Sequence, residues 1–299
     1  MDLFGAVEAG GTKFICGVGN DSGNLIAEQR IETRSPEETL PQVVQFFQEQ
    51  SRKYEKEIRR IGIGSFGPLD LDPGSSAFGH ITSTPKIGWP DTDIPDYLHL
   101  HLNCECTIDT DVNAAAYGEY LWGSGRGLGS IVYFTIGTGI GGGAIINGIP
   151  LHGLVHPEMG HMIVNHDFSE DPFPGVCPYH NDCFEGLANG PSLHARWKLE
   201  PGKIPNGHPA WDLEANYISQ ALHSVVTILS PQRIILGGGV MQQPALLPRI
   251  RKLVKGSLNG YVRSDLMTSE IDDYIVAPLL GNRAGVLGSL ALAIKPPGD

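Results

Sequence analysis

Two stretches of the chain, one in each half, share an arrangement of apolar strand, glycine-rich turn and second strand. The first runs over residues 3–20 (LFGAVEAGGTKFICGVGN), and the second over residues 131–151 (IVYFTIGTGIGGGAIINGIPL). Taken singly, each reads as a plain hairpin turn. Together, two hairpins with backbone N–H groups at their tips can face each other across a cleft and hold a polyphosphate from both sides.

The first tip offers several groups that suit a bound phosphate. Its backbone N–H groups, hydroxyl and ammonium belong to Gly10, Gly11, Thr12 and Lys13. Glu8, just before the tip, lies where a carboxylate could contact a magnesium ion or one of its waters. The second tip contains Thr138.

A thirty-residue stretch from His156 to Glu185, HPEMGHMIVNHDFSEDPFPGVCPYHNDCFE, carries a candidate metal site. The predicted ligands are His161, Cys177, His180 and Cys183. Two thiols and two imidazoles are the donor set of a closed tetrahedral zinc site, which is structural because no position is left for water. The alternative is that these four side chains are merely close in sequence.

Two glutamates adjoin these ligands: Glu158 precedes His161 by three residues, and Glu185 follows Cys183 by two. An ionised carboxylate offers only acceptors, so a rigid pair of carboxylates can bind adjacent hydroxyls of a sugar. The alternative is two solvated glutamates.

Composition limits the classes of function. A length of 299 residues allows two domains, and a net charge of −12 argues against a nucleic-acid partner. No apolar run approaches the ~20 residues that would span a bilayer, so no membrane association is expected. The remaining cysteines, Cys16, Cys104 and Cys106, are expected to be reduced thiols, as is usual in the cytoplasm.

An amphipathic helix is expected after residues 35–38, whose sequence SPEE is expected to cap it. The strand RIGIGSF follows this helix and ends in the Gly67-Pro68 loop. A long loop, GHITSTPKIGWPDTDIP, then reads as a binding loop or as a surface excursion. The next strand, ECTID, precedes the helix that Asp111 opens. Asp111 is either the N-cap of this helix or a general base for an attacking hydroxyl. Candidate substrate contacts in this region are Gly67, Pro68, Thr84, Lys86, Trp89 and Asn113.

Near the C-terminal end, the strand RIILGGGV runs into a glycine triplet. Glycine at the carboxyl end of a strand permits close approach of a nucleotide base or ribose, although it also suits a simple turn. These residues are Gly237, Gly238 and Gly239. The final apolar helix is expected to pack back on a domain.

Five motifs, EAGGTK, TDVNAAAYGE, GTGIGGG, HPEMGH and CPYHNDCFE, together resemble the ROK family of sugar kinases, and more closely its bacterial fructokinases. The resemblance implies a duplicated α/β fold of the actin/hexokinase (ribonuclease H-like) type, with two domains and a cleft. We expect a smaller domain over residues 1–120, a larger one over 121–282 that carries the zinc loop, and helix 283–295 packing back on the first.

The resemblance also implies ATP and Mg²⁺ as cofactors, a structural Zn²⁺, and transfer of phosphoryl to the terminal primary hydroxyl of fructose. Asp111 matches the family's base, Glu158 and Glu185 its sugar-binding glutamates, and the glycine triplet its nucleotide region. The phosphate loops match Gly10 to Lys13 and the second tip, which includes Thr138, Gly139 and Gly141. A homodimer in the cytoplasm is expected by analogy alone.

Two departures from the family pattern bear on these expectations. Glu8 stands where many members have Asp, which keeps the carboxylate. The spacing of the last Cys differs, so His156 or His166 could replace His180 as a ligand. Glucose, mannose or an N-acetylated amino sugar remains an alternative substrate, and a non-catalytic sugar sensor remains an alternative function.

Overall fold

A computed structural model describes residues 2–84 and 86–298, and the chain forms two compact units. The first unit comprises residues 1–127, 143–157 and 279–299, and the second comprises residues 128–142 and 158–278. The chain passes from one unit to the other after Gly127, Gly142, Pro157 and Pro278. The crossing at Gly142 lies inside a β-strand rather than in a loop.

The first unit contains a five-stranded sheet with the order β3-β2-β1-β4-β5. Its strands are β1 (Leu3–Ala9), β2 (Lys13–Asn20), β3 (Leu25–Glu32), β4 (Arg60–Ser65) and β5 (Glu105–Thr110). Strands β1 and β2 form the predicted antiparallel hairpin, whereas β1, β4 and β5 run parallel. The carboxyl ends of the three parallel strands therefore share one edge of the sheet.

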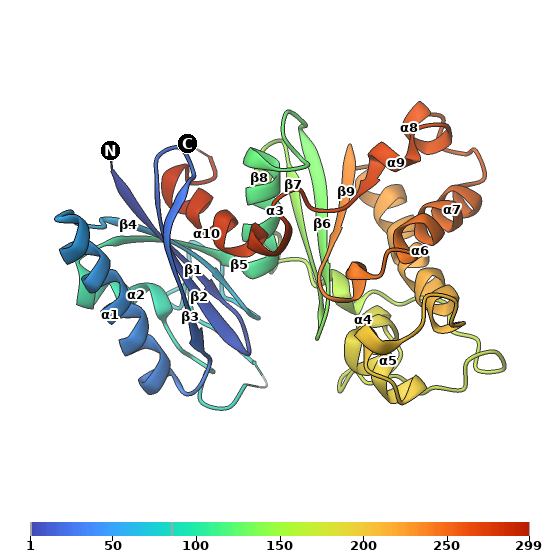
Figure 1. Cartoon of the computed structure of the whole chain (residues 1–299), viewed down its shortest axis with the longest axis horizontal. Helices are drawn as coiled ribbons and strands as arrows, with labels where there is room; N and C mark the ends of the chain where they lie inside the picture. The colour runs from blue at the N-terminus through green and yellow to red at the C-terminus, as the bar shows by residue number, and fades with distance from the viewer. Residues whose placement is uncertain (1, 85, 299) are drawn as a thin grey trace. The chain divides into compact units, whose positions relative to one another are not determined.

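Helices cover both faces of this sheet (Figure 1). They are α1 (Pro36–Tyr54), α2 (Ile94–Leu102), α3 (Asp111–Trp122) and α10 (Ala284–Ile294). Alternate residues of β1 and β2 face opposite sides, as the strand period of two requires. Val7 and Phe14 join the core that includes α1 residues, while Ala6 and Ile15 pack with Leu290 of α10.

The second sheet has the order β10-β9-β6-β7-β8. Its strands are β6 (Ser130–Ile136), β7 (Ile140–Ile146), β8 (Ile149–Pro150), β9 (Arg233–Gly237) and β10 (Ile275–Val276). The helices of the second unit are α4 (Phe184–Ala188), α5 (Gly190–Trp197), α6 (Ala210–Leu229), α7 (Leu246–Leu258), α8 (Asp265–Thr268) and α9 (Ile271–Tyr274). Helices α6 and α7 lie side by side (Figure 1).

The boundaries of the units differ from the expected division. Residues 121–127 and 279–282, expected in the second domain, belong to the first unit, and so do residues 143–157. The physical reason is close packing on α3: a Cβ at Gly143 would lie 2.5 Å from the Val112 carbonyl oxygen, and one at Gly148 would lie 3.0 Å from the Tyr120 hydroxyl. Within the described part of the chain, none of the helices has both the length and the apolar character needed to cross a bilayer.

Candidate functional site

Asp111 lies where β5 ends and α3 begins, as the sequence predicted. The N-cap of α3 is Thr110, however, whose side-chain oxygen accepts a hydrogen bond from the Asn113 backbone N–H at 3.1 Å. Asp111 is the first residue of the helix, and its Oδ1 accepts from the Val112 N–H at 2.9 Å. The interpretation of Asp111 as the helix N-cap is therefore wrong, because the neighbouring threonine performs that role.

A second carboxylate, Asp109, lies two residues before Asp111 and is almost fully buried. Its Oδ1 accepts hydrogen bonds from the Thr110 N–H at 2.7 Å and from the Asn113 Nδ2 at 2.8 Å. The His152 Nε2 lies 3.1 Å from both Asp109 oxygens. The hydrogen bond with Asp109 raises the pKa of His152, although burial acts in the opposite direction.

Sequence reasoning missed both Asp109 and His152. The carboxylate of Asp109 could have been noticed at the end of a predicted strand, but nothing in the sequence indicates its pairing with a histidine 43 residues away. Asn113, expected to contact the substrate, is 1% exposed, and its amide nitrogen donates to Asp109 in this structure. A contact between Asn113 and the substrate stays a prediction.

The first phosphate tip follows β1 and is stabilised by backbone contacts. The Gly10 N–H donates to the Lys13 carbonyl at 3.0 Å, and the Thr33 hydroxyl donates to the Gly10 carbonyl at 2.7 Å. Lys86 of the long loop reaches this tip, where its Nζ donates to the Gly11 carbonyl. Thr12 at the tip is exposed and Gly11 is half-buried, so these two predicted phosphate contacts are accessible, whereas the Gly10 N–H is already bonded within the tip.

Glu8, at the end of the same strand, is largely buried, and burial raises its pKa. The first turn of α10 comes so close that a Cβ at Gly285 would lie 2.4 Å from the Glu8 carboxyl carbon. A side chain at position 285 would displace the Glu8 carboxylate from its observed place. A contact between Glu8 and magnesium stays a prediction.

The long loop differs from expectation at one of its three candidate residues. Trp89 is fully buried, packs against Phe14 and Phe66, and donates its indole N–H to the Arg34 carbonyl at 2.7 Å. Thr84 is 9% exposed. Trp89 therefore fastens the loop to the core and exposes no surface to a ligand, which disagrees with the expected substrate contact. A contact between Thr84 and the substrate stays a prediction.

The segment of residues 151–157 crosses the carboxyl ends of β5 and β4. His152 binds Asp109 at the end of β5, and the His156 Nε2 accepts from the Leu69 N–H, after β4, at 3.1 Å. Gly67 lies directly beside the His156 ring, since a Cβ at Gly67 would be 3.4 Å from Nε2. The Gly67-Pro68 loop therefore lies at the same sheet edge as Asp111, and both of its residues are half-buried.

In the second unit, the four predicted metal ligands come together. Their donor atoms all lie within 4.8 Å of one another. The His161 Nδ1 is 3.7 Å from the Cys177 Sγ and 3.5 Å from the Cys183 Sγ, and the His180 Nδ1 is 3.7 Å from the Cys177 Sγ. A tetrahedron with zinc bonds of 2.0–2.3 Å has edges of about 3.3–3.8 Å. The donor set is that of a zinc site, and these three distances lie within the range for a tetrahedron, although the four donors as a set spread to 4.8 Å.

The two alternative histidines lie elsewhere. His156 belongs to the first unit and binds the Leu69 N–H. The His166 Nδ1 lies 3.1 Å from an Asp182 oxygen, and its Nε2 lies 2.8 Å from the Asp171 carbonyl oxygen. Neither belongs to the cluster, so the described structure supports His180 as the fourth donor. Burial raises the pKa of the Cys183 thiol to about 11, which a bound cation would oppose.

Glu185 lies on the first turn of α4, directly after Cys183, the N-cap of that helix, and Phe184. Its Oε2 accepts from the Ile140 N–H at 2.7 Å, so the carboxylate is bound to the second glycine-rich tip. A Cβ at Gly139 would lie 2.8 Å from the same oxygen. Glu158 is exposed and begins the 3₁₀ turn Met159–His161. Glu185, a candidate sugar-binding residue, is therefore in direct contact with the second glycine-rich tip, a candidate phosphate loop.

The glycine triplet also lies against this tip, which includes Thr138 and Gly141. Gly238 has a φ of +94°, and a Cβ there would lie 2.3 Å from the Ile136 carbonyl oxygen. A Cβ at Gly137 would lie 3.8 Å from the Gly239 nitrogen, and the Gly190 N–H donates to the Gly137 carbonyl at 2.7 Å. Gly237 ends β9. The predicted phosphate and nucleotide segments of the second unit thus form one surface.

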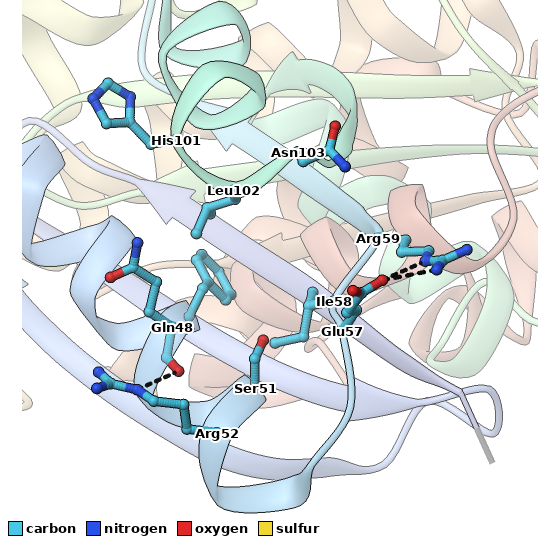
Figure 2. A pocket seen from close by; sticks show the side chains of 10 residues that line it. Gln48, Ser51, Arg52, Glu57, Ile58, Arg59, His101, Leu102 and Asn103 are labelled. Atoms are coloured by element: carbon cyan, nitrogen blue, oxygen red, sulfur yellow. Dashed lines mark hydrogen bonds and ion pairs between the residues drawn. The ribbon is translucent and has the colours of Figure 1, made fainter.

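A separate cavity of about 460 Å³ lies in the first unit (Figure 2). Its walls include Phe47, Ile58, Arg59, Leu102 and Asn103. Arg59 and Asn103 precede the amino ends of β4 and β5, whereas Asp111 follows the carboxyl end of β5. A six-residue strand is about 20 Å long, so this cavity is remote from the candidate site.

Comparison with known proteins identifies the family. The ROK family model matches residues 4–296, and the chain belongs to the ROK family. It is 42% identical to a fructokinase of Lactococcus lactis over 97% of this chain and 96% of the relative. It is 40% identical to a fructokinase of Zymomonas mobilis over 98% of this chain and 96% of the relative.

The fold is likewise confirmed. A solved ROK family glucokinase from Streptomyces griseus, in complex with glucose and AMPPNP, matches with a TM-score of 0.75 and 25% identity. The match covers 97% of this chain and 99% of the glucokinase chain. The predicted family and α/β fold class are correct.

Proposed function

We propose that the chain transfers the γ-phosphoryl group of ATP to the terminal primary hydroxyl of fructose, giving fructose 6-phosphate. The observation that carries this proposal is identity of 40–42% with curated fructokinases over nearly the full length of both chains. The residues described above supply the parts that such a reaction needs: a base, two accessible glycine-rich tips and two carboxylates.

The roles follow from the chemistry of each group. Asp111 accepts the proton of the attacking hydroxyl, and Glu158 and Glu185 accept hydrogen bonds from adjacent sugar hydroxyls. The glycine-rich tips bind phosphate oxygens through backbone N–H groups, and Mg²⁺ neutralises the developing charge when it is bound. Glu8 is the carboxylate that we assign to the magnesium ion or its water.

We also assign a structural zinc ion to His161, Cys177, His180 and Cys183. Its support is the convergence of two thiols and two imidazoles within 4.8 Å of one another, the donor types of a closed zinc site. All four protein positions are used, so the metal would stabilise the loop before α4 and take no part in the chemistry. The expected homodimer and cytoplasmic location stay predictions, and sedimentation of the purified chain would check the first.

The test of the proposed activity is ADP release with fructose, mannose, glucose and N-acetylglucosamine at saturating ATP and Mg²⁺. We expect kcat/KM to be highest for fructose, about 10- to 100-fold above glucose, because a hydroxyl in the wrong place leaves a fixed carboxylate poorly paired. Mannose is expected second. A larger kcat/KM for glucose would overturn the substrate but not the phosphoryl transfer, whereas no ADP release with any sugar would overturn both.

A further inference from the structure

We propose that His152 binds the sugar directly through its Nδ1 atom, and that Asp109 holds the imidazole in place for this contact. His152 would thereby be a specificity residue, and Asp109 a positioning residue. The inference rests on the proposed function, because it assumes that the reacting end of the sugar lies beside Asp111.

The first argument is the fixed orientation of the imidazole. Its Nε2 lies 3.1 Å from both oxygens of Asp109, whose side chain is only 4% exposed. Asp109 is itself held by N–H groups of Thr110 and Asn113 on the helix that begins with Asp111. The Asn113 Nδ2 also lies 3.3 Å from Nε2. Because the two Asp109 oxygens are nearer and only accept, we assign the proton to Nε2, which fixes the tautomer and orients the ring.

The second argument is the state of the other ring nitrogen. Among residues 2–84 and 86–298, no group forms a hydrogen bond with the Nδ1 of His152, and the side chain is 37% exposed. With Nε2 protonated, Nδ1 accepts in the neutral ring and donates in the charged ring. A sugar hydroxyl can both donate and accept, so it fits either state, whereas a phosphate oxygen only accepts.

The third argument is location. His152 lies at the carboxyl end of β5, and His156 fastens the same segment to Leu69 after β4. The first phosphate tip follows β1, which β4 separates from β5. With about 4.8 Å between neighbouring strands, that tip is about 10 Å from the end of β5. A ligand group next to His152 is therefore the sugar that Asp111 deprotonates, not the phosphate.

Two substitutions separate sugar contact from a purely structural role. His152→Gln keeps an amide nitrogen where Nε2 binds Asp109 but removes the group at Nδ1. His152→Asn keeps a polar group at the Nδ1 position but is too short to reach Asp109. The matched control is His80→Gln, because the His80 Nε2 also pairs with a carboxylate, Asp93, at 3.2 Å, with side chains 28% and 29% exposed.

Fructose affinity is measured by isothermal titration calorimetry, and KM and kcat by ADP release. We expect His152→Gln to weaken fructose binding and raise its KM by about 10-fold, the effect of losing one hydrogen bond, with kcat changed less than about 3-fold. His152→Asn should lose less affinity, and His80→Gln should match the wild type. The KM for ATP should stay unchanged in all three variants.

In the opposite order, His152→Gln behaves as the wild type and His152→Asn is impaired. That result would show that His152 only attaches its segment to Asp109, and it would overturn the inference. A set of monodeoxyfructoses provides a second readout. One of these deoxy sugars should bind the wild type about 10-fold more weakly than fructose binds it. The same deoxy sugar and fructose should bind His152→Gln with equal affinity. If every deoxy sugar loses the same factor in both proteins, the direct contact is excluded.

If fructose is not the substrate, the binding and activity measurements distinguish that failure from failure of the His152 inference. If the wild type binds and phosphorylates glucose or mannose but not fructose, the Gln and Asn variants are compared with that sugar, and the same order of affinities decides the inference. A wild-type chain that binds none of the three sugars would overturn both proposals.

Discussion

At the scale of single residues, the junction of β5 and α3 divides its tasks between neighbours. Thr110 caps the helix, Asp109 is buried and hydrogen-bonded, and Asp111 is only half-buried. Because the cap and the buried charge are provided by other residues, the carboxylate of Asp111 is not needed for either. This division favours a chemical role for Asp111.

The first prediction concerns that carboxylate. Asp111→Asn should lower kcat at least ~10²-fold while changing fructose affinity less than a few-fold, because the amide keeps the shape but accepts no proton. ADP release and calorimetry measure the two quantities. Asp96→Asn, in the first turn of α2, is the control and should leave kcat unchanged. An Asn variant with more than a tenth of the wild-type kcat would rule out the general base.

Glu214, on α6, permits a prediction of pH dependence. Its side chain is 1% exposed, neither oxygen has a hydrogen bond within the described structure, and burial raises its pKa well above the ordinary 4.5. A carboxyl with a raised folded-state pKa adds stability that is complete below about pH 4.5 and is lost as pH rises toward the folded-state value.

Glu214→Gln removes the ionisation and should therefore stabilise the chain, relative to the wild type, more at pH 8 than at pH 5. The difference should be at least about 1 kcal/mol, because each pH unit over which the unfolded carboxyl is ionised and the folded one stays protonated costs about 1.4 kcal/mol. Urea unfolding at the two pH values measures it. Glu49→Gln, on the exposed face of α1, should show no such pH dependence. An equal effect of Glu214→Gln at both pH values would contradict the prediction.

Residue types and spacing predicted the metal cluster, since CPYHNDC places three ligands in one tight loop. Hydrogen bonds between the backbones of Cys177 and Asn181 close that loop, and only local sequence is needed for them. Trp89 was wrongly predicted because an aromatic residue in a polar loop looks the same whether it contacts a ligand or fastens the loop to the core. The pairing of His152 with Asp109 depends on tertiary packing, which residue spacing does not reveal.

At the scale of elements, the metal loop leads directly into α4. Cys183 is both a proposed zinc ligand and the N-cap residue of this helix, and Glu185 lies on its first turn. The Val176 N–H also donates to the Gly186 carbonyl at 3.0 Å, which joins the start of the loop to the helix. A change at the metal is therefore transmitted to the Glu185 carboxylate through two residues of backbone.

We expect the purified chain to contain about one zinc per molecule, and Cys183→Ser to lose the metal, lower the Tm and raise the KM for fructose by ~10- to 100-fold. Elemental analysis, thermal unfolding and ADP release measure these effects. Cys106→Ser, in β5 and outside the cluster, should retain the zinc. Fully active wild-type enzyme without zinc would contradict the assignment.

Strand and helix periods predicted most elements of the first sheet, including the β1–β2 hairpin and the crossover helix α1. The assignment of residues 143–157, which include the end of β7 and all of β8, to the first unit was not predictable. It depends on Gly143 and Gly148 fitting against α3, and a glycine in the sequence does not indicate which neighbour comes close. The expected capping of α1 was correct in position only, since Ser35 makes no side-chain cap hydrogen bond.

At the scale of the whole molecule, Glu119 of α3 forms hydrogen bonds with two segments that are far apart in the sequence. It is fully buried, and its carboxylate accepts backbone N–H groups from Ser124 at 2.7 Å, Leu279 at 3.2 Å and Leu280 at 2.8 Å. Two of the places where the chain passes between units, after Gly127 and after Pro278, lie within a few residues of these contacts. A single side chain therefore anchors two distant segments of the chain.

Glu119→Gln should reduce the free energy of unfolding by about 1–3 kcal/mol, because an amide retains one acceptor oxygen and places an NH₂ group against a backbone N–H. Urea unfolding measures this change. The same substitution at exposed Glu49 should have almost no effect. A Glu119→Gln variant as stable as the wild type would show that the three hydrogen bonds contribute little.

The hydrogen bond from Ile140 N–H to Glu185 has a thermodynamic consequence. If the glycine-rich tip binds ATP and Glu185 binds the sugar, as we propose, a shift of the tip moves the carboxylate, and nucleotide and sugar affinities become linked. Linkage is reciprocal: AMPPNP must change the dissociation constant of fructose by the same factor by which fructose changes that of AMPPNP. Calorimetric titrations in both orders should give equal factors above one. An enzyme with such coupling would bind its nucleotide most tightly when an acceptor is present, which limits ATP hydrolysis without sugar.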